Sequence, residues 1–113
     1  RLLEIGDAEY TKLAEIDPTY SPTVIPTDTY KGVTGDTKTV ASPVLMYTTD
    51  DMSDDLAYKL TKAFWDHRKM IADAHATGKG LDIAGVRYGV AKVHPGAQRY
   101  YKEVGVEIPA SMR

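Results

Sequence analysis

Three histidines are the side chains with the widest chemical range in this sequence, because imidazole binds metals and exchanges protons near neutral pH. His67 and His75 lie eight residues apart, and His94 is more distant in sequence. On one helix, eight residues span about 12 Å, which is too far for two side chains to chelate one ion unaided. The spacing favours ordinary structural histidines, and no metal site is expected.

An acidic cluster follows at Asp50, Asp51, Asp54 and Asp55. Carboxylates at alternating positions bind calcium when a central glycine and a terminal glutamate complete the loop. This cluster has neither the alternation nor those two residues. Carboxylates here instead suit the capping and first turn of a helix, where they interact favourably with its dipole.

None of the remaining motifs predicts a residue that performs covalent catalysis. Cysteine is absent, and neither a Gly-x-Ser-x-Gly nucleophile turn nor a complete phosphate-binding glycine loop occurs. The sequence therefore predicts no catalytic residue, no cofactor and no enzyme, and a small hydrolase or isomerase remains as an alternative. Lysine and arginine number 14 against 16 aspartates and glutamates, a net charge of −2, which argues against nucleic-acid partners.

The segment 18–39 contains the hydroxyl groups with the best prospect of binding a ligand. It holds three prolines and seven threonines together with Tyr20 and Tyr30. Hydroxyls and backbone amides on extended chain can bind a small polar or anionic solute if a second wall excludes water. No such wall is evident in the sequence, and a surface connection rich in turn-forming residues is the alternative.

The surrounding pattern predicts the elements that position this segment. An apolar run over 2–5 is typical of a strand, Asp7 suits the N-cap of a helix ending before Pro18, and short strands are expected over 23–25 and 90–93. A strand from Val40, apolar on both faces over 44–47, is expected to be covered on both sides. The spacing predicts a long helix over 53–76, with a break near 67–69, and a terminal helix over 95–104. One apolar face of the long helix is formed by Leu56, Leu60, Phe64, His67, Ile71 and His75.

Several ordered motifs carry a family resemblance over roughly residues 1–106. They are Tyr20 to Pro22, Ile25-Pro26-x-x-x-Tyr30-x-Gly32, Thr39-Val40-x-x-Pro43-x-Leu45, the helix start from Asp54 to Ala63, His75, and His94-Pro95-Gly96-Ala97-x-Arg99-Tyr100-Tyr101-x-Glu103-x-Gly105. In this order they resemble the C-terminal third of the TAXI-type solute receptors of TRAP transporters. The run from His94 to Tyr101 is the most specific of them.

The resemblance implies an α/β fold: the C-terminal part of a two-lobed, type II-like periplasmic binding protein, with a few strands covered by helices. Residues 1–113 would form a single segment of a receptor about three times as long. Such a receptor is periplasmic or secreted, with its signal peptide outside this chain. It binds a small amino acid or organic acid, glutamate-like in character, and delivers it to TRAP membrane permease subunits.

By the same resemblance, residues 18–43 would form an extended crossover or hinge at the edge of the ligand cleft. Tyr20, Thr27, Tyr30 and Ser42 are the candidate ligand-binding or hinge residues. The terminal motif from His94 is expected to anchor a helix rather than to contact solute.

A stand-alone protein-interaction module is the alternative from another functional class. Eight tyrosines favour interfaces, but they are scattered and define no patch. For a receptor fragment, open strand edges and an uncovered apolar face would also lead to dimers through the exposed surfaces.

Overall fold

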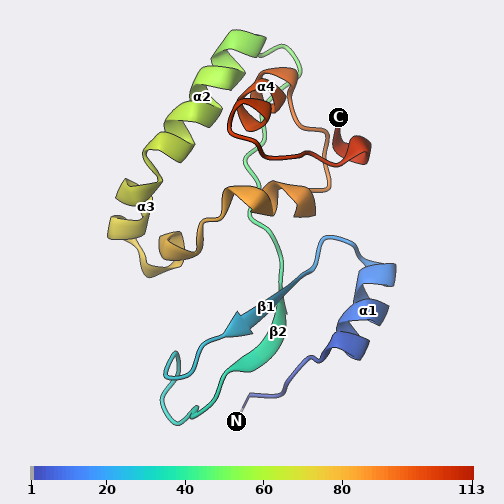
Figure 1. The fold of residues 1–113 in the computed structure, drawn as a ribbon, viewed down its shortest axis with the longest axis vertical. Coiled ribbons are helices and arrows are strands. Elements are labelled where there is room, and N and C mark those ends of the chain that lie inside the picture. Colours follow the sequence, from blue (N-terminus) through green and yellow to red (C-terminus); the bar gives the residue numbers. More distant parts are fainter. Residues whose placement is uncertain (1) are drawn as a thin grey trace. The chain divides into compact units, whose positions relative to one another are not determined.

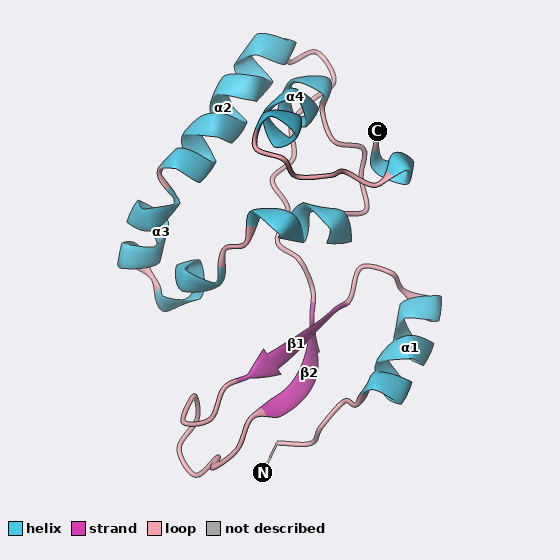
Figure 2. Cartoon of the chain, in the orientation of Figure 1, coloured by secondary structure: helices cyan, strands magenta, loops and turns pink. Residues whose placement is uncertain are grey.

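The chain forms two units of different architecture in the computed structural model, which describes residues 2–113. The first unit spans Arg1–Val44 and the second spans Leu45–Arg113. The first contains one helix and a two-stranded antiparallel sheet, and the second is built from helices (Figures 1 and 2). The expected α/β class is confirmed. No helix in the described part of the chain is both long and apolar enough to cross a membrane.

The first unit begins with α1 (Asp7–Ile16), followed by β1 (Ser21–Ile25) and β2 (Thr37–Ala41). Gly6 is the N-cap of α1, so the prediction that Asp7 caps the helix is wrong by one position. Asp7 lies in the first helical turn, where its carboxylate favours the helix dipole and forms an ion pair with Lys38 at 3.0 Å. The helix ends at Ile16 because Asp17 precedes a proline and leaves helical geometry, with φ −143°.

The two strands pair antiparallel, with Ser21 opposite Ala41 and Ile25 opposite Thr37. The loop between them turns with two left-handed residues, Asp28 at φ 63° and Gly32 at φ 83°. Glycine and aspartate tolerate this conformation better than other residues. The region 18–43 is therefore a β-ribbon with irregular ends, and its expected strand over 23–25 extends over five residues.

The predicted doubly covered strand over 40–47 is wrong. β2 ends at Ala41, and the side chains of Val44, Met46 and Tyr47 are 99%, 78% and 68% exposed. Two causes combine. Pro43 lacks the N–H needed for a strand ladder, and the chain before Ser21 turns at Pro18 and Thr19 instead of extending beside the residues after Ala41. The expected strand over 2–5 is also absent among the described residues, where Ile5 donates a single hydrogen bond to the Lys38 carbonyl, at 3.0 Å.

The second unit contains three α-helices and three 3-10 turns. In chain order they are α2 (Asp54–Asp66), α3 (Arg68–Ala74), η1 (Ala76–Gly80), η2 (Ile83–Tyr88), α4 (Pro95–Glu103) and η3 (Ala110–Met112). The Ser53 hydroxyl caps α2 by accepting the Leu56 N–H at 3.3 Å. The helix predicted over 53–76 is divided at His67, whose ψ of 13° takes its backbone out of α-helical geometry.

Residues 90–93, expected to form a strand, contain no regular element. The Val93 N–H instead donates to the Met112 carbonyl at 2.7 Å, which joins the approach to α4 to the C-terminal turn. α4 begins with Pro95 in its first turn, ends at Glu103, and is followed by Gly105 at φ 75°. These bounds lie within one residue of the range 95–104 that the sequence indicates.

The core of the second unit lies between α2, α4 and the C-terminal segment. Its most buried side chains are Ala57, Trp65, Tyr100, Ile108 and Met112. The rings of Tyr58 and Tyr100 meet edge to face, with centroids 6.1 Å apart. α2 therefore presents the face of Ala57 and Trp65 to its partner helix.

The apolar face predicted to form the core side of the long helix is largely solvent-exposed. Leu56, Leu60 and Ile71 are 47%, 48% and 37% exposed, and His67 and His75 are also exposed. Leu56 and Leu60 come one residue before Ala57 and Thr61. Because one residue turns a helix by about 100°, the two pairs lie on different faces of α2. The prediction failed because two faces of α2 are apolar, and α4 packs against the other one.

Gly96 permits the close approach of α4 to α2. A Cβ atom built on Gly96 would overlap the Asp54 carbonyl oxygen and lie 2.9 Å from the Tyr58 backbone nitrogen. We expect Gly96→Ala to lower the free energy of unfolding by about 1–3 kcal/mol, because backbone atoms cannot move aside as a flexible side chain can. Urea unfolding followed by Trp65 fluorescence measures the change.

Gly85→Ala is the matched control, since a Cβ at Gly85 meets no atom within 4 Å and its φ is not left-handed. This change should be neutral or slightly stabilising, by up to ~1 kcal/mol. Equal effects of the two substitutions would contradict the assigned close approach.

Asp55 connects α2 to α4 on the surface. Its carboxylate forms ion pairs with Lys59 at 2.6 Å and with Arg99 of α4 at 3.3 Å. Hydrogen bonds from Lys59, and next from Arg99, hold the pKa of Asp55 below its ordinary value. The resulting stabilisation is complete above the unfolded-state pKa of about 3.9 and is lost as pH falls through the lower folded-state pKa.

Carboxyl carbon NMR titration tests this assignment. We expect Lys59→Met to raise the pKa of Asp55 toward its ordinary value, because the hydrogen bond that lowers that pKa most is removed. Lys12→Met, which alters an exposed lysine of α1, should leave that pKa unchanged. An Asp55 pKa that does not respond to Lys59→Met would rule out the proposed cause.

Candidate functional site

The β-ribbon places the four predicted ligand-binding residues in two pairs. Tyr20 immediately precedes β1 and Ser42 immediately follows β2, so both lie beyond the Ser21–Ala41 pair at one end. Thr27 and Tyr30 lie in the loop beyond Ile25 and Thr37, at the other end. Five strand residues at about 3.4 Å each separate the two ends by roughly 17 Å. A solute the size of an amino acid contacts one pair and not both.

The Tyr20–Ser42 end is braced by local hydrogen bonds. Asp17 accepts the Thr19 N–H at 2.9 Å, and that backbone hydrogen bond lowers the pKa of the Asp17 carboxyl. The Ser21 hydroxyl donates to the Ala41 carbonyl at 3.3 Å, across the two strands. Tyr20 is half-buried and Ser42 is exposed. This end therefore offers one half-buried phenol and one accessible hydroxyl.

The Thr27–Tyr30 end is a more exposed loop. The Thr27 N–H donates to Asp36 Oδ1 at 2.8 Å, so this backbone amide is already occupied. The Thr29 hydroxyl donates to the Pro26 carbonyl at 2.7 Å, which uses a second donor within the loop. Tyr30 is 55% exposed. The hydroxyls of Thr27 and Tyr30 remain available here as donors to a solute.

A small groove runs beside the ribbon, and the motifs of the sequence did not indicate it. Its volume is about 180 Å³, and it is lined by Ile5, Asp7, Tyr10, Pro22, Thr23, Val24, Lys38 and Thr39. None of the four predicted residues lines this groove. The exposed Asp7–Lys38 ion pair supplies one charge of each sign at the groove. Because Asp7 and Lys38 lie 31 positions apart, no periodic pattern in the sequence predicts that they pair.

In the second unit, the His94–Tyr101 motif serves the packing of α4. His94 Nδ1 accepts the Gly96 N–H at 3.2 Å, and Nε2 lies 2.9 Å from the Met52 carbonyl oxygen. A carbonyl only accepts, so Nε2 carries the proton and the ring connects α4 to the residues before α2. Tyr100 is buried and the Tyr101 hydroxyl accepts from the Trp65 indole at 3.4 Å. These contacts support the expected anchoring role of the motif.

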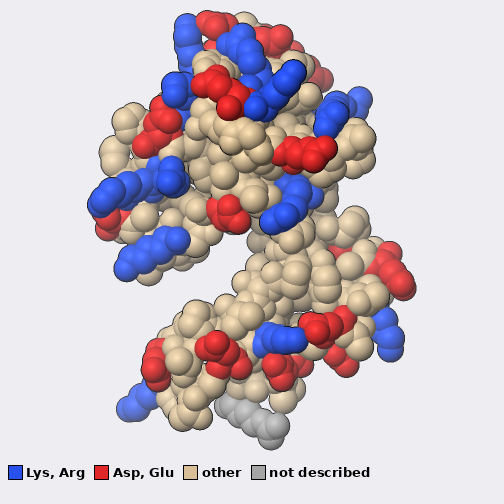
Figure 3. Space-filling model, in the orientation of Figure 1, with Lys and Arg blue, Asp and Glu red and all other residues tan. Residues whose placement is uncertain are grey.

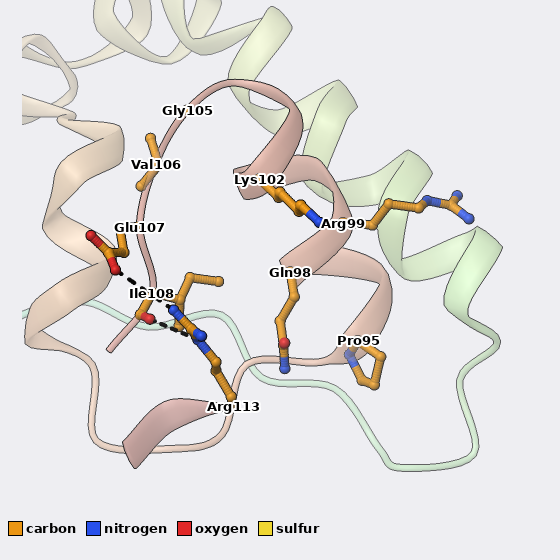
Figure 4. Close-up of a pocket in the computed structure, with 9 residues that line it drawn as sticks. All are labelled: Pro95, Gln98, Arg99, Lys102, Gly105, Val106, Glu107, Ile108 and Arg113. Atoms are coloured by element: carbon orange, nitrogen blue, oxygen red, sulfur yellow. Dashed lines mark hydrogen bonds and ion pairs between the residues drawn. The ribbon is translucent and has the colours of Figure 1, made fainter. Parts of the chain in front are cut away.

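A larger cavity of about 600 Å³ lies beside α4. Its lining, shown in Figure 4, consists of Pro95, Gln98, Arg99, Lys102, Gly105, Val106, Glu107, Ile108 and Arg113. Most of its polar groups have partners: Gln98 donates to the Val93 carbonyl at 2.6 Å, and Arg113 donates to the Ile108 carbonyl at 3.0 Å and pairs with Glu107 at 3.8 Å. The cavity is a second concave surface, and the sequence indicated only its α4 side, as the terminal helix expected over 95–104.

The surface carries both signs of charge over the helical unit. Figure 3 shows lysines and arginines interspersed with aspartates and glutamates on the face in view. Many of these charges are paired four residues apart, as in Lys62–Asp66 and Lys69–Asp73. No group of three or more histidines, aspartates or glutamates able to hold a metal ion occurs among residues 2–113.

A comparison with known protein families covers most of the chain. The model of the NMT1-like family matches residues 1–105, which include the β-ribbon, α2, α3 and all of α4. This family is related to periplasmic binding proteins, binds small-molecule substrates, is not enzymatic, and is typically extracytoplasmic. The match supports a solute-binding function in general terms. The chain belongs to the NMT1-like family of solute-binding proteins.

Proposed function

We propose that this chain is the C-terminal third of a TAXI-type receptor for a TRAP transporter. In this proposal it binds a small amino acid or organic acid, glutamate-like in character, outside the cytoplasm and delivers it to membrane permease subunits. The observation that carries the proposal is the family match over residues 1–105, which spans the hydroxyl-rich ribbon and the terminal helix together. The ordered motifs from Tyr20 to Gly105 supply the narrower TAXI assignment.

Within this proposal, residues 18–43 form the crossover at the cleft edge and contribute one wall of the solute site. The ribbon has hydroxyls at both ends but no fully buried residue of its own in the described part of the first unit. A binding site needs concave walls that exclude water. We therefore assign the opposite wall to the remainder of a two-lobed receptor of roughly 300 residues, two lobes of ordinary domain size.

A ligand screen on the full-length polypeptide tests solute binding. We expect L-glutamate, L-glutamine or succinate to raise the melting temperature, because a ligand at 100 times its dissociation constant stabilises the folded state by about 2.7 kcal/mol. Differential scanning fluorimetry measures the shift, and a neutral sugar alcohol of similar size is the control. A panel of small amino acids and organic acids that leaves the melting temperature unchanged would overturn the proposal.

The solute contact is proposed at the Tyr20–Ser42 end of the ribbon. Tyr20 is half-buried, so less side-chain freedom is lost when it binds than for the exposed Tyr30. We expect Tyr20→Phe with Ser42→Ala to weaken solute binding by about tenfold or more, corresponding to hydrogen bonds worth about 1.4 kcal/mol or more in total. Isothermal titration calorimetry with the solute found in the screen measures this loss.

The matched control is Thr27→Val with Tyr30→Phe, which removes the same number of hydroxyls at the opposite end. Because the ends lie roughly 17 Å apart, this pair should leave the affinity within about twofold. A loss confined to the Thr27–Tyr30 variant would move the contact to the loop end, and equal losses from both pairs would contradict a small solute.

A further inference from the structure

An exposed apolar stripe runs along α2. It comprises Leu56, Leu60 and Ala63, which are spaced four and three residues apart. Leu56 and Leu60 are 47% and 48% exposed, and Ala63 is exposed as well. Steps of four and three place side chains along one seam of a helix, the arrangement through which two helices pair. The stripe ends before His67, where the backbone leaves α-helical geometry and α2 gives way to α3 (Figure 1).

The stripe is separate from the face that α4 covers. Ala57 and Trp65 are buried against the rest of the helical unit, while Leu56 and Leu60 lie about 100° around the helix from Ala57 and Thr61. Asp55, Lys59, Lys62 and Asp66 occupy the third side of α2, where they form the pairs Lys59–Asp55 and Lys62–Asp66. α2 thus has one apolar face in the core of its unit and one in solvent.

The charged residues beside the stripe allow two copies of α2 to bring opposite charges together. Lys59 and Asp66 lie seven residues apart and therefore on the same flank of the seam. When two copies of α2 pair antiparallel, with Leu60 of one copy beside Ala63 of the other, Lys59 lies opposite Asp66 of the second copy, and the symmetry creates this pair twice. The present partners of both residues lie on exposed helix surface, where ion pairs contribute little and can exchange.

We propose that the stripe is a self-association surface, through which two copies of this chain pair by antiparallel contact of their α2 helices. The antiparallel arrangement follows from charge: a parallel pair would bring the acidic first turns of the two helices, at Asp54 and Asp55, together. Few side chains are buried, so the dimer is of the weak, concentration-dependent class that small interfaces form. This inference uses the second unit alone and is independent of solute binding.

Sedimentation equilibrium of the 113-residue chain tests the proposal. We expect the weight-average mass to rise from monomer toward dimer as concentration increases from the micromolar to about the millimolar range. Leu60→Glu should raise the dissociation constant at least about tenfold, because each dimer would bury two carboxylates at its centre. Glutamate is a good helix former, so far-UV circular dichroism and the melting temperature should show that α2 remains folded.

Val44→Glu is the matched control, since Val44 is 99% exposed and lies in the other unit. It introduces the same charge at an exposed apolar residue and should leave the dissociation constant within about twofold. A chain that remains monomeric up to millimolar concentration overturns the proposal. So does association that Leu60→Glu and Val44→Glu weaken equally.

A charge exchange tests the antiparallel register. Lys59→Glu should weaken association several-fold, because the introduced carboxylate would face that of Asp66 in the second copy. Adding Asp66→Lys to that variant restores the opposite charges and should recover the original dissociation constant. Failure of the double variant to recover, while it stays folded, overturns the antiparallel pairing. None of these measurements depends on whether the receptor proposal or its solute is correct.

Discussion

The close contact between α2 and α4 at Gly96 is the constraint on which the helical unit depends. With no side chain at Gly96, the first turn of α4 lies directly against the backbone of Asp54 and Tyr58. The remaining contacts between these helices require that proximity: Tyr58 donates to Glu103 at 2.6 Å, the Arg99 guanidinium lies 4.1 Å from the Tyr58 ring centroid, and Tyr100 is buried beneath them. One backbone approach thereby determines which aromatic rings become core and which charges pair at its rim.

The ribbon unit is stabilised by different means. None of its described residues is fully buried, and its shape depends on strand pairing, the Asp17 and Asp36 side-chain hydrogen bonds, and the Asp7–Lys38 ion pair. A two-stranded ribbon of this kind is only marginally stable by itself in water. Its polar character nevertheless suits a binding surface, because hydroxyls at its ends remain available to a solute. The same feature that limits its stability therefore supports its proposed role at a cleft edge.

The two apolar faces of α2 have different roles, one in the folding of its unit and one in the proposed association of two copies. Its Ala57–Trp65 face stabilises the unit, while its Leu56–Leu60 face leaves apolar area in solvent that a second helix can cover. A sequence pattern with apolar residues on two sides of one helix does not reveal which side the chain will cover itself. The packing of α4 determines which side is covered, because Gly96 brings the α4 backbone directly against the α2 backbone at Asp54 and Tyr58.

Local signals in the sequence were sufficient to predict the first and last α-helices and the general class of solute-binding proteins. The helices at 7–16 and 95–103 follow from proline and glycine boundaries and carboxylate-rich or proline-led first turns, which act within one turn of chain. The resemblance to solute receptors also needed only ordered motifs, and the family match agrees with its general class. Three features follow from tertiary contacts: β2 stops at Ala41, the Leu56–Leu60 face is exposed, and Tyr20 and Ser42 lie at the opposite end of the ribbon from Thr27 and Tyr30. Each of these depends on a partner that is distant in sequence, a strand register or a packed helix, and periodicity within one segment carries no information about that partner.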